Sequence, residues 1–276
     1  MKLKRRYTLI CFSLFLLYYG CDYVDPIETF EPKLVIQSYL YESRPFSNVV
    51  LKQTISDEDL LKHIYYQEND FKLISDAEIS LSVDDSLFIS LIESPDKPGR
   101  YIVDPNNDTF IAKPSQRITL DCIYENQHLS AETIVPDSIT LNLIFPQNDI
   151  YIDSTDSVVI HLDSSSANIG YFVKVEESEE LGPDVDFIYH KYLPSERYFL
   201  TTSNTVIIPN NFFRYYGIEY IITVLNLDQN LFDFYRSLTH PPFDPEPVIM
   251  HVEGGLGIFG SASKTEVAVV VQKIEN

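Results

Sequence analysis

Cys21 lies in a context that predicts covalent modification of its sulfur. It directly follows Gly20, and before it stand four basic residues without an acid and then an almost unbroken apolar run at residues 9–19. This order is typical of a secretory signal, and the run is too short to span a bilayer comfortably. In bacterial lipoproteins the signal is cleaved just before such a cysteine, whose thiol becomes a diacylglycerol thioether. We therefore predict a lipoprotein signal peptide at residues 1–20 and lipidation of Cys21.

The same segment predicts where the chain resides. Two or three acyl chains hold a protein on a membrane almost permanently, and the early acids Asp22 and Asp25 resemble an export signal of surface lipoproteins. We expect an outer-membrane, lipid-anchored protein exposed at the cell surface, with the periplasmic leaflet as the alternative. Tyr18 replaces the usual Leu or Val three residues before the cysteine. A non-cleaved anchor or an ordinary signal with an incidental cysteine therefore stays open.

Two short motifs near the C-terminus match the spacing of enzyme sites. Gly255, Gly257 and Gly260 are spaced as in a dinucleotide-binding loop, but that loop requires a following helix and an acid about twenty residues on. Ser261 and Lys264 are spaced as in penicillin-recognising enzymes, whose further elements are missing from the sequence. We expect a glycine bend in which backbone approaches backbone, followed by a closing strand at Glu266–Gln272. We expect no catalytic residues, no cofactor and no enzyme activity.

The candidate metal ligands are weak. Asp104, Asn106 and Asp108 offer oxygen atoms at alternate positions, as a calcium loop does, but the glycine and the bidentate glutamate of such a loop are missing. Because Asn and Asp commonly form turns, a turn is the preferred interpretation, and calcium binding stays open. The six histidines are dispersed without cysteine companions, so we expect no zinc site.

Cys122 is the third cysteine, after Cys11 in the predicted signal and Cys21. Apolar and polar side chains alternate around it, which is typical of a strand with one buried face. We therefore interpret Cys122 as a buried structural residue and not as a reactive thiol.

Charge and composition restrict the classes of partner. The chain has 276 residues, and removing residues 1–20 discards four cations and no acids, which leaves 16 basic against 41 acidic residues and a net charge of −25. Such a charge repels nucleic acids and anionic lipid headgroups. The hydrophobic fraction of 45% is typical of a chain with well-formed cores.

The hydrophobic pattern predicts an all-β fold of two β-sandwich domains. Residues 21–32 are polar and form a tether, and short segments of strand period follow from residue 33. We expect an immunoglobulin-like sandwich at 33–136 and a fibronectin III-like sandwich at 137–276. The second contains one short helix at 228–239, capped by Asp228, with Leu231, Phe234, Tyr235 and Leu238 on its buried face.

The candidate contact surface lies in two irregular segments that interrupt the strands. Residues 56–69 form a charged stretch and residues 176–197 an acidic stretch with prolines. Loops of this kind often carry binding residues. The residues that we select there as ligand or partner contacts are Tyr65, Tyr66, Glu179, Glu180 and Tyr189.

Several segments together resemble a bacterial lipoprotein family. They are the cysteine context at residue 21, Pro-Lys-Leu-Val-Ile at 32–36, Asp-Ala-Glu-Ile-Ser-Leu at 76–81, Gly-Arg-Tyr at 99–101, the helix at 231–238 and Glu-Gly-Gly-Leu-Gly-Ile-Phe-Gly at 253–260. The pattern resembles the Bacteroidetes family called domain of unknown function 4249. Asp76, where the family often has Gly, and an insertion at 56–72 depart from it. The resemblance implies no catalytic residues, and it implies a companion of TonB-dependent outer-membrane receptors.

These observations predict a non-enzymatic cell-envelope lipoprotein. We expect it to be an accessory to a TonB-dependent, SusC-like outer-membrane transporter in ligand capture. A surface adhesin or glycan-binding module is the alternative, although the chain has no Trp, the residue on which such modules often stack sugars.

Overall fold

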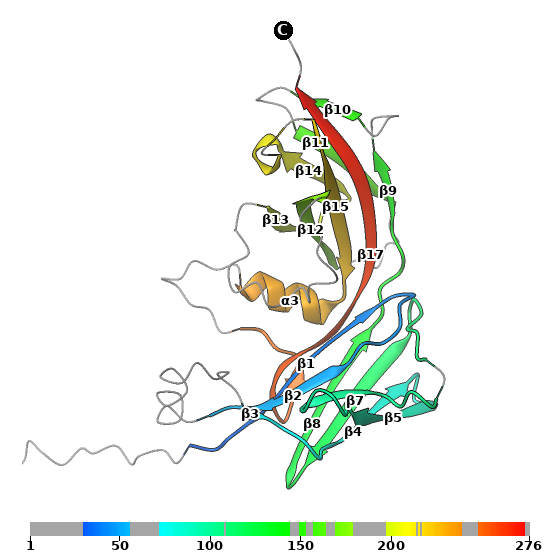
Figure 1. Cartoon of the computed structure of the whole chain (residues 1–276), viewed down its shortest axis with the longest axis vertical. Helices are drawn as coiled ribbons and strands as arrows, with labels where there is room; N and C mark the ends of the chain where they lie inside the picture. Colours follow the sequence, from blue (N-terminus) through cyan, green and yellow to red (C-terminus); the bar gives the residue numbers. More distant parts are fainter. Residues whose placement is uncertain are drawn as a thin grey trace, which may run out of the picture.

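The protein is built mainly from β-strands, as the computed structural model in Figure 1 shows. The structure describes residues 30–55, 72–107, 109–143, 149–152, 157–163, 169–178, 197–213, 215, 217–238 and 248–273. Within these ranges one α-helix accompanies the strands. Two large groups of buried apolar side chains form two cores, one mainly from each half of the chain. The predicted all-β, sandwich-type fold with a single short helix is confirmed.

The first core lies between strands of the N-terminal half. They are β1 (Leu34–Tyr41), β2 (Val49–Gln53), β3 (Lys72–Leu73), β4 (Glu78–Val83), β5 (Leu87–Glu93), β6 (Arg100–Val103), β7 (Arg117–Tyr124) and β8 (Gln127–Ile134). Their order in the sheet is β1-β2-β6-β5-β4-β7-β8, and β3 pairs with β2. Every second side chain of β1 is buried, because the side chains of a strand point alternately to opposite faces. Leu51, Leu81 and Leu120 lie at the centre and are fully buried.

The second core lies between two sheets of the C-terminal half. Its strands are β9 (Thr140–Leu143), β10 (Asp149–Ile152), β11 (Ser157–Asp163), β12 (Gly170–Glu177), β13 (Tyr198–Thr201), β14 (Thr205–Pro209), β15 (Ile218–Leu227) and β17 (Leu256–Lys273). One layer runs β13-β12-β15-β17 and the other β14-β11-β9. Val173 and Val224 from the first layer are buried in one cluster with Ile160 and Val206 from the second. Two layers with a shared apolar interior form a β-sandwich.

The last strand, β17, belongs to both cores. It pairs in parallel with β1 over residues 256–262 and antiparallel with β15 over residues 262–271. Phe259 is therefore buried in the first core and Val269 in the second. Figure 1 shows β17 as one long curved strand that runs between the two halves. A division of the chain at residue 136 leaves this strand in contact with both sides.

The glycine-rich segment differs in part from its prediction. The bend is confined to Gly254 and Gly255, between β16 (Val252–Glu253) and β17, whereas the sequence predicted that the final strand begins at Glu266. At Gly257 the φ angle is 112°, and a Cβ atom would lie 1.9 Å from the carbonyl oxygen of Ile36 on β1. Only glycine permits this approach. The close backbone contact is thus confirmed, and the predicted start of the last strand is wrong.

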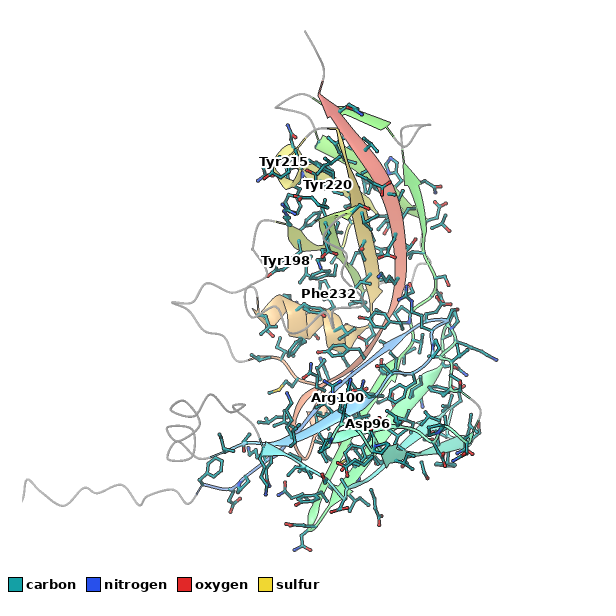
Figure 2. The ribbon with its side chains drawn as sticks, viewed as in Figure 1. Asp96, Arg100, Tyr198, Tyr215, Tyr220 and Phe232 are labelled. Carbon is teal, nitrogen blue, oxygen red and sulfur yellow. The ribbon has the colours of Figure 1, made fainter. Side chains whose placement is uncertain are left out.

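Two buried tyrosines form hydrogen bonds with the backbone of nearby loops. The Tyr101 hydroxyl donates to the carbonyl oxygen of Ile74 at 2.9 Å and accepts from the N–H of Ala77 at 3.0 Å. Near the start of β15, the Tyr220 hydroxyl donates to the carbonyl oxygen of Tyr215 at 3.0 Å and accepts from its N–H at 2.8 Å. Figure 2 shows this pair at the upper end of the second core. A hydroxyl that binds backbone a few residues upstream is the tyrosine corner of immunoglobulin-like sandwiches.

The helix α3 (Gln229–Leu238) packs at the end of the second core that faces the first (Figure 1). The N–H of Leu231 donates to Oδ1 of Asp228 at 2.8 Å, which confirms the predicted N-cap. The ends of the helix agree with the predicted range within one residue. Leu238, which was expected on the buried face, is 54% exposed, so that part of the prediction is wrong.

Candidate functional site at the joint between the cores

The site residues selected from the sequence fall in parts of the chain that the structure does not describe. They are Cys21, Tyr65, Tyr66, Glu179, Glu180 and Tyr189. The predicted lipidation and the predicted contact surface therefore stay predictions. The described residues contain a different polar site, which lies between the two cores.

Asp104 and its neighbours form a turn. The backbone N–H and the side-chain amide of Asn106 donate to Oδ1 of Asp104 at 2.9 and 2.8 Å, and the N–H of Asn107 donates to its carbonyl oxygen at 2.8 Å. The predicted turn is confirmed, and Asp108 lies outside the described residues. Among the described residues, no group of three or more His, Cys, Asp or Glu could hold a metal ion.

Cys122 is buried, as predicted. Its side chain is fully inaccessible within the first core. Burial raises the pKa of the thiol to about 12, because the apolar surroundings disfavour the thiolate. The thiol is therefore inert near neutral pH.

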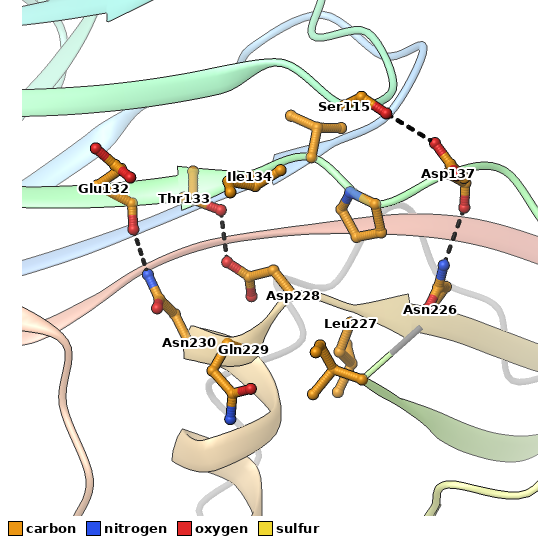
Figure 3. Close-up of a pocket in the computed structure, with 13 residues that line it drawn as sticks. Ser115, Glu132, Thr133, Ile134, Asp137, Asn226, Leu227, Asp228, Gln229 and Asn230 are labelled. Carbon is orange, nitrogen blue, oxygen red and sulfur yellow. Dashed lines mark hydrogen bonds between the residues drawn. The ribbon is translucent and has the colours of Figure 1, made fainter. Parts of the chain in front are cut away.

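A pocket of about 390 Å³ opens where the end of β8 meets the start of α3 (Figure 3). Its apolar lining residues are Ile134, Val135, Pro136, Ile169 and Leu227. Its polar lining residues are Ser115, Glu132, Thr133, Asp137, Asn226, Asp228, Gln229 and Asn230. The pocket thus combines an apolar wall with hydroxyl, amide and carboxyl groups from both halves of the chain.

Asp228 is the buried carboxyl group of this site, with 6% of its surface exposed. Oδ1 caps α3 by accepting the N–H of Leu231, and Oδ2 lies 2.5 Å from Oγ1 of Thr133 on β8. Burial raises the pKa of Asp228 to about 6, although the hydrogen bonds from Thr133 and Leu231 act to lower it. Loss of hydration therefore outweighs these donors.

Side-chain amides and a hydroxyl make further connections across the joint. Asn230 donates from Nδ2 to the carbonyl oxygens of Glu132 at 2.6 Å and Phe259 at 2.8 Å, which connects α3 with β8 and β17. The carbonyl oxygen of Asp137 accepts from Nδ2 of Asn226 at 3.0 Å and from the hydroxyl of Ser263 at 2.9 Å. Each such bond contributes about 1 kcal/mol net, and losing one partner inside the protein costs more. These connections favour a fixed arrangement of the two cores.

Asp233 holds the segment before β16 against α3. Its carboxylate accepts from Nε2 of Gln229 at 2.6 Å and from Arg236 at 2.7 Å, and it lies 3.0 Å from Nε2 of His251. Burial acts to raise the pKa of Asp233, but the hydrogen bonds from Gln229 and His251 and the charge of Arg236 together lower it. This carboxylate is therefore ionised at neutral pH.

The sequence predicted only one member of the joint, Asp228. The signal for the others is weak: Thr133 lies in phase with the buried Ala131 and Val135 of the β8 region, and Ser261 in phase with the buried Phe259. A hydroxyl on the inward phase of a strand indicates a buried hydrogen bond. It does not identify the partner.

The fold and the tyrosine corner at Tyr220 define an all-β protein of the immunoglobulin-like and fibronectin III-like sandwich class. Within that class the chain belongs to the family described as Domain of unknown function (DUF4249), whose sequence profile matches residues 22–267. The resemblance found in the sequence is therefore confirmed at the level of the family.

Solved structures that resemble the chain have low identity. Fibronectin(III)-like modules of CbhA from Clostridium thermocellum share 11% identity at a TM-score of 0.26, covering 89% of this chain and 97% of theirs. The FN1-FN3 domains of chicken CNTN1 share 11% identity at a TM-score of 0.20, covering 89% and 68%. No curated protein matches the chain. None of the helices in the described ranges has the length and apolar character needed to cross a bilayer.

Proposed function

We propose that this chain is a non-enzymatic lipoprotein of the outer membrane, exposed at the cell surface, that assists a TonB-dependent, SusC-like transporter in ligand capture. Acyl chains on Cys21 would anchor it, and the tether at residues 21–32 would connect the anchor to β1. Membership in the family supports this role through the receptor companionship that the resemblance implies. The net charge of −25 after residue 20 favours a protein or neutral ligand over nucleic acid.

The observation that carries the proposal is the fixed connection between the cores. Because β17 belongs to both cores and buried hydrogen bonds hold α3 against β8, the two halves form one extended body. The end of the second core near Tyr215 lies far from the start of β1 (Figures 1 and 2). A tether before β1 would therefore place that end away from the anchor, where a partner can reach it. This geometry suits a module that positions a binding surface beside a larger receptor.

Co-purification tests the role directly. The tagged chain would be isolated from gently solubilised outer membranes, with an unrelated outer-membrane lipoprotein carrying the same tag as the control. We expect a TonB-dependent transporter to co-purify with this chain and not with the control. Repeated preparations without any transporter would refute the proposal.

The lipid anchor needs its own test, because the transporter role depends on it. Mass spectrometry of the N-terminal peptide should find a diacylglycerol thioether on Cys21. The Cys21→Ser variant should lose the lipid and leave the membrane fraction. An unmodified sulfur, with the protein free in the medium, would contradict the tethered location.

A surface adhesin or glycan-binding module is the second proposal. Exposed aromatic side chains support it, since Phe88 on β5 is 72% exposed and Tyr215 is 57% exposed, and sugars stack on such rings. A glycan array is the test: reproducible hits that disappear in the Tyr215→Ala variant would favour this role. Tyr215 contributes backbone atoms to the tyrosine corner, so the substitution leaves the Tyr220 hydrogen bonds in place.

A further inference from the structure

Four oxygen atoms form a continuous buried row across the joint. Oδ2 of Asp228 lies 2.5 Å from Oγ1 of Thr133, which lies 2.6 Å from Oγ of Ser261, which lies 3.1 Å from the carbonyl oxygen of Ile134. Thr133, Asp228 and Ser261 are 3%, 6% and 0% exposed, respectively. The row connects the end of β8, the first residue before α3 and the part of β17 that pairs with β1. It therefore lies where the two cores meet.

The row has one hydrogen atom too few for its contacts when Asp228 is ionised. Its three oxygen-to-oxygen contacts need three hydrogen atoms, and the hydroxyls of Thr133 and Ser261 supply two. The carbonyl oxygen of Ile134 can only accept. If Asp228 is ionised it also only accepts, and one of the three contacts then brings two lone pairs together. A proton on Oδ2 of Asp228 supplies the third hydrogen.

We propose that Asp228 carries a proton in the folded protein at mildly acidic pH, and that this proton completes a hydrogen-bond chain that makes the joint between the cores sensitive to pH. In the protonated state Asp228 donates to Thr133, Thr133 donates to Ser261, and Ser261 donates to the carbonyl oxygen of Ile134. Oδ1 still accepts the N–H of Leu231 and keeps its role as the helix cap. Every polar atom in the row is then paired, as buried polar atoms usually are.

Ionisation of Asp228 reverses the direction of the hydrogen bonds in the row. Thr133 then donates to the carboxylate and Ser261 donates to Thr133, so the carbonyl oxygen of Ile134 loses its donor in the row. The joint keeps the Asn230 connections but loses one hydrogen bond between β17 and β8. Raising the pH thus weakens the contact between the cores.

Other ionisable groups lie on the elements that carry or contact the row. His251, in the segment before β16, favours the carboxylate when it is protonated. On α3, Asp233 and Arg236 pair with each other, and β17 carries the pair Lys264 and Glu266. Glu132 on β8 and Asp137 after it line the same pocket. A variant at one of these positions shows whether general charge or the row itself sets the titration of Asp228.

Carbon-13 NMR of aspartate-labelled protein measures the protonation state directly. The Cγ signal of Asp228, identified by its loss in the Asp228→Asn variant, should titrate near pH 6. In the Ser261→Ala variant, Thr133 has no acceptor except the carboxylate, so the midpoint should fall by about one pH unit, a tenfold change in acidity. Glu132→Gln is the matched control, because it removes a charge from the same pocket without touching the row, and its midpoint should stay close to that of the wild type.

Two outcomes would overturn the proposal. One is a wild-type carboxyl that titrates in the ordinary aspartate range. The other is a midpoint near pH 6 that Ser261→Ala leaves unchanged, since burial alone would then hold the proton. Ser261→Cys provides a second route if Ser261→Ala fails to fold, because sulfur is a weak hydrogen-bond acceptor and the side chain still fills the site, and it should lower the midpoint in the same direction.

Discussion

The Asp228→Asn substitution should change how the stability of this protein depends on pH. Burial raises the pKa of the carboxyl from 3.8 to about 6 in the folded protein, so the folded state binds the proton more tightly than the unfolded state. The free energy of unfolding therefore contains a contribution that is complete below pH 4 and is lost as the pH rises to about 6. The difference between the two pKa values corresponds to about 3 kcal/mol.

The asparagine side chain lacks this titration and can keep both contacts. Its oxygen can accept the N–H of Leu231, and its amide can donate to Thr133. The stability of the wild type relative to the variant should therefore fall by about 2.5 kcal/mol between pH 4 and pH 7. Carboxylates with a lowered pKa, such as Glu93 and Glu266, lose their stabilising contribution as the pH falls. That opposite trend is common to both proteins and cancels in the difference.

Urea unfolding at a series of pH values gives this difference. The unfolding is monitored by far-ultraviolet circular dichroism, because the chain has no Trp. Glu132→Gln serves again as the charge-matched control. A stability difference that is constant from pH 4 to pH 7, or one that grows with pH in favour of the wild type, would refute the reasoning.

Three further predictions, the first with a control variant, test the fold. Gly257→Ala should reduce the free energy of unfolding by about 4 kcal/mol or prevent folding, because its Cβ would overlap the backbone of Ile36. Gly217→Ala is its control, since Gly217 also has a positive φ of 78° but open space around it, and urea unfolding should give a loss of about 1 kcal/mol. Tyr220→Phe should cost about 2 kcal/mol in the same assay, because the tyrosine corner loses both hydrogen bonds; a cost near zero would contradict its role. Asp85→Gly should raise the melting temperature slightly, with a gain of about 0.5 kcal/mol, because Asp85 has a φ of 54° in the three-residue connection between β4 and β5, a conformation that favours glycine; a lower melting temperature would count against this.

The sequence predicted the features that depend on local pattern. Alternation identified the strand around Cys122 and its buried side chain, and an acid before a helical stripe identified Asp228 as a cap. The all-β fold class and the single helix could be predicted from such short-range periodicity. The burial of the last helical turn was predicted wrongly, because Leu238 continues the apolar spacing and yet lies exposed.

Pairings between distant residues could not be predicted in this way. Thr133 and Ser261 are separated by 128 positions, and nothing in either neighbourhood indicates the other. The parallel pairing of β1 with β17 could not be predicted for the same reason, since the alternation in each strand is compatible with several neighbouring strands. The joint is therefore visible only once the chain is folded.

The strand shared by the two cores also constrains the order of assembly. β17 is synthesised long after β1, so the N-terminal sheet keeps an open edge at β1 until residues 256–262 have emerged. Contacts so distant in sequence form slowly. A chain cut short before residue 256 therefore leaves β1 with an exposed edge that is prone to aggregation.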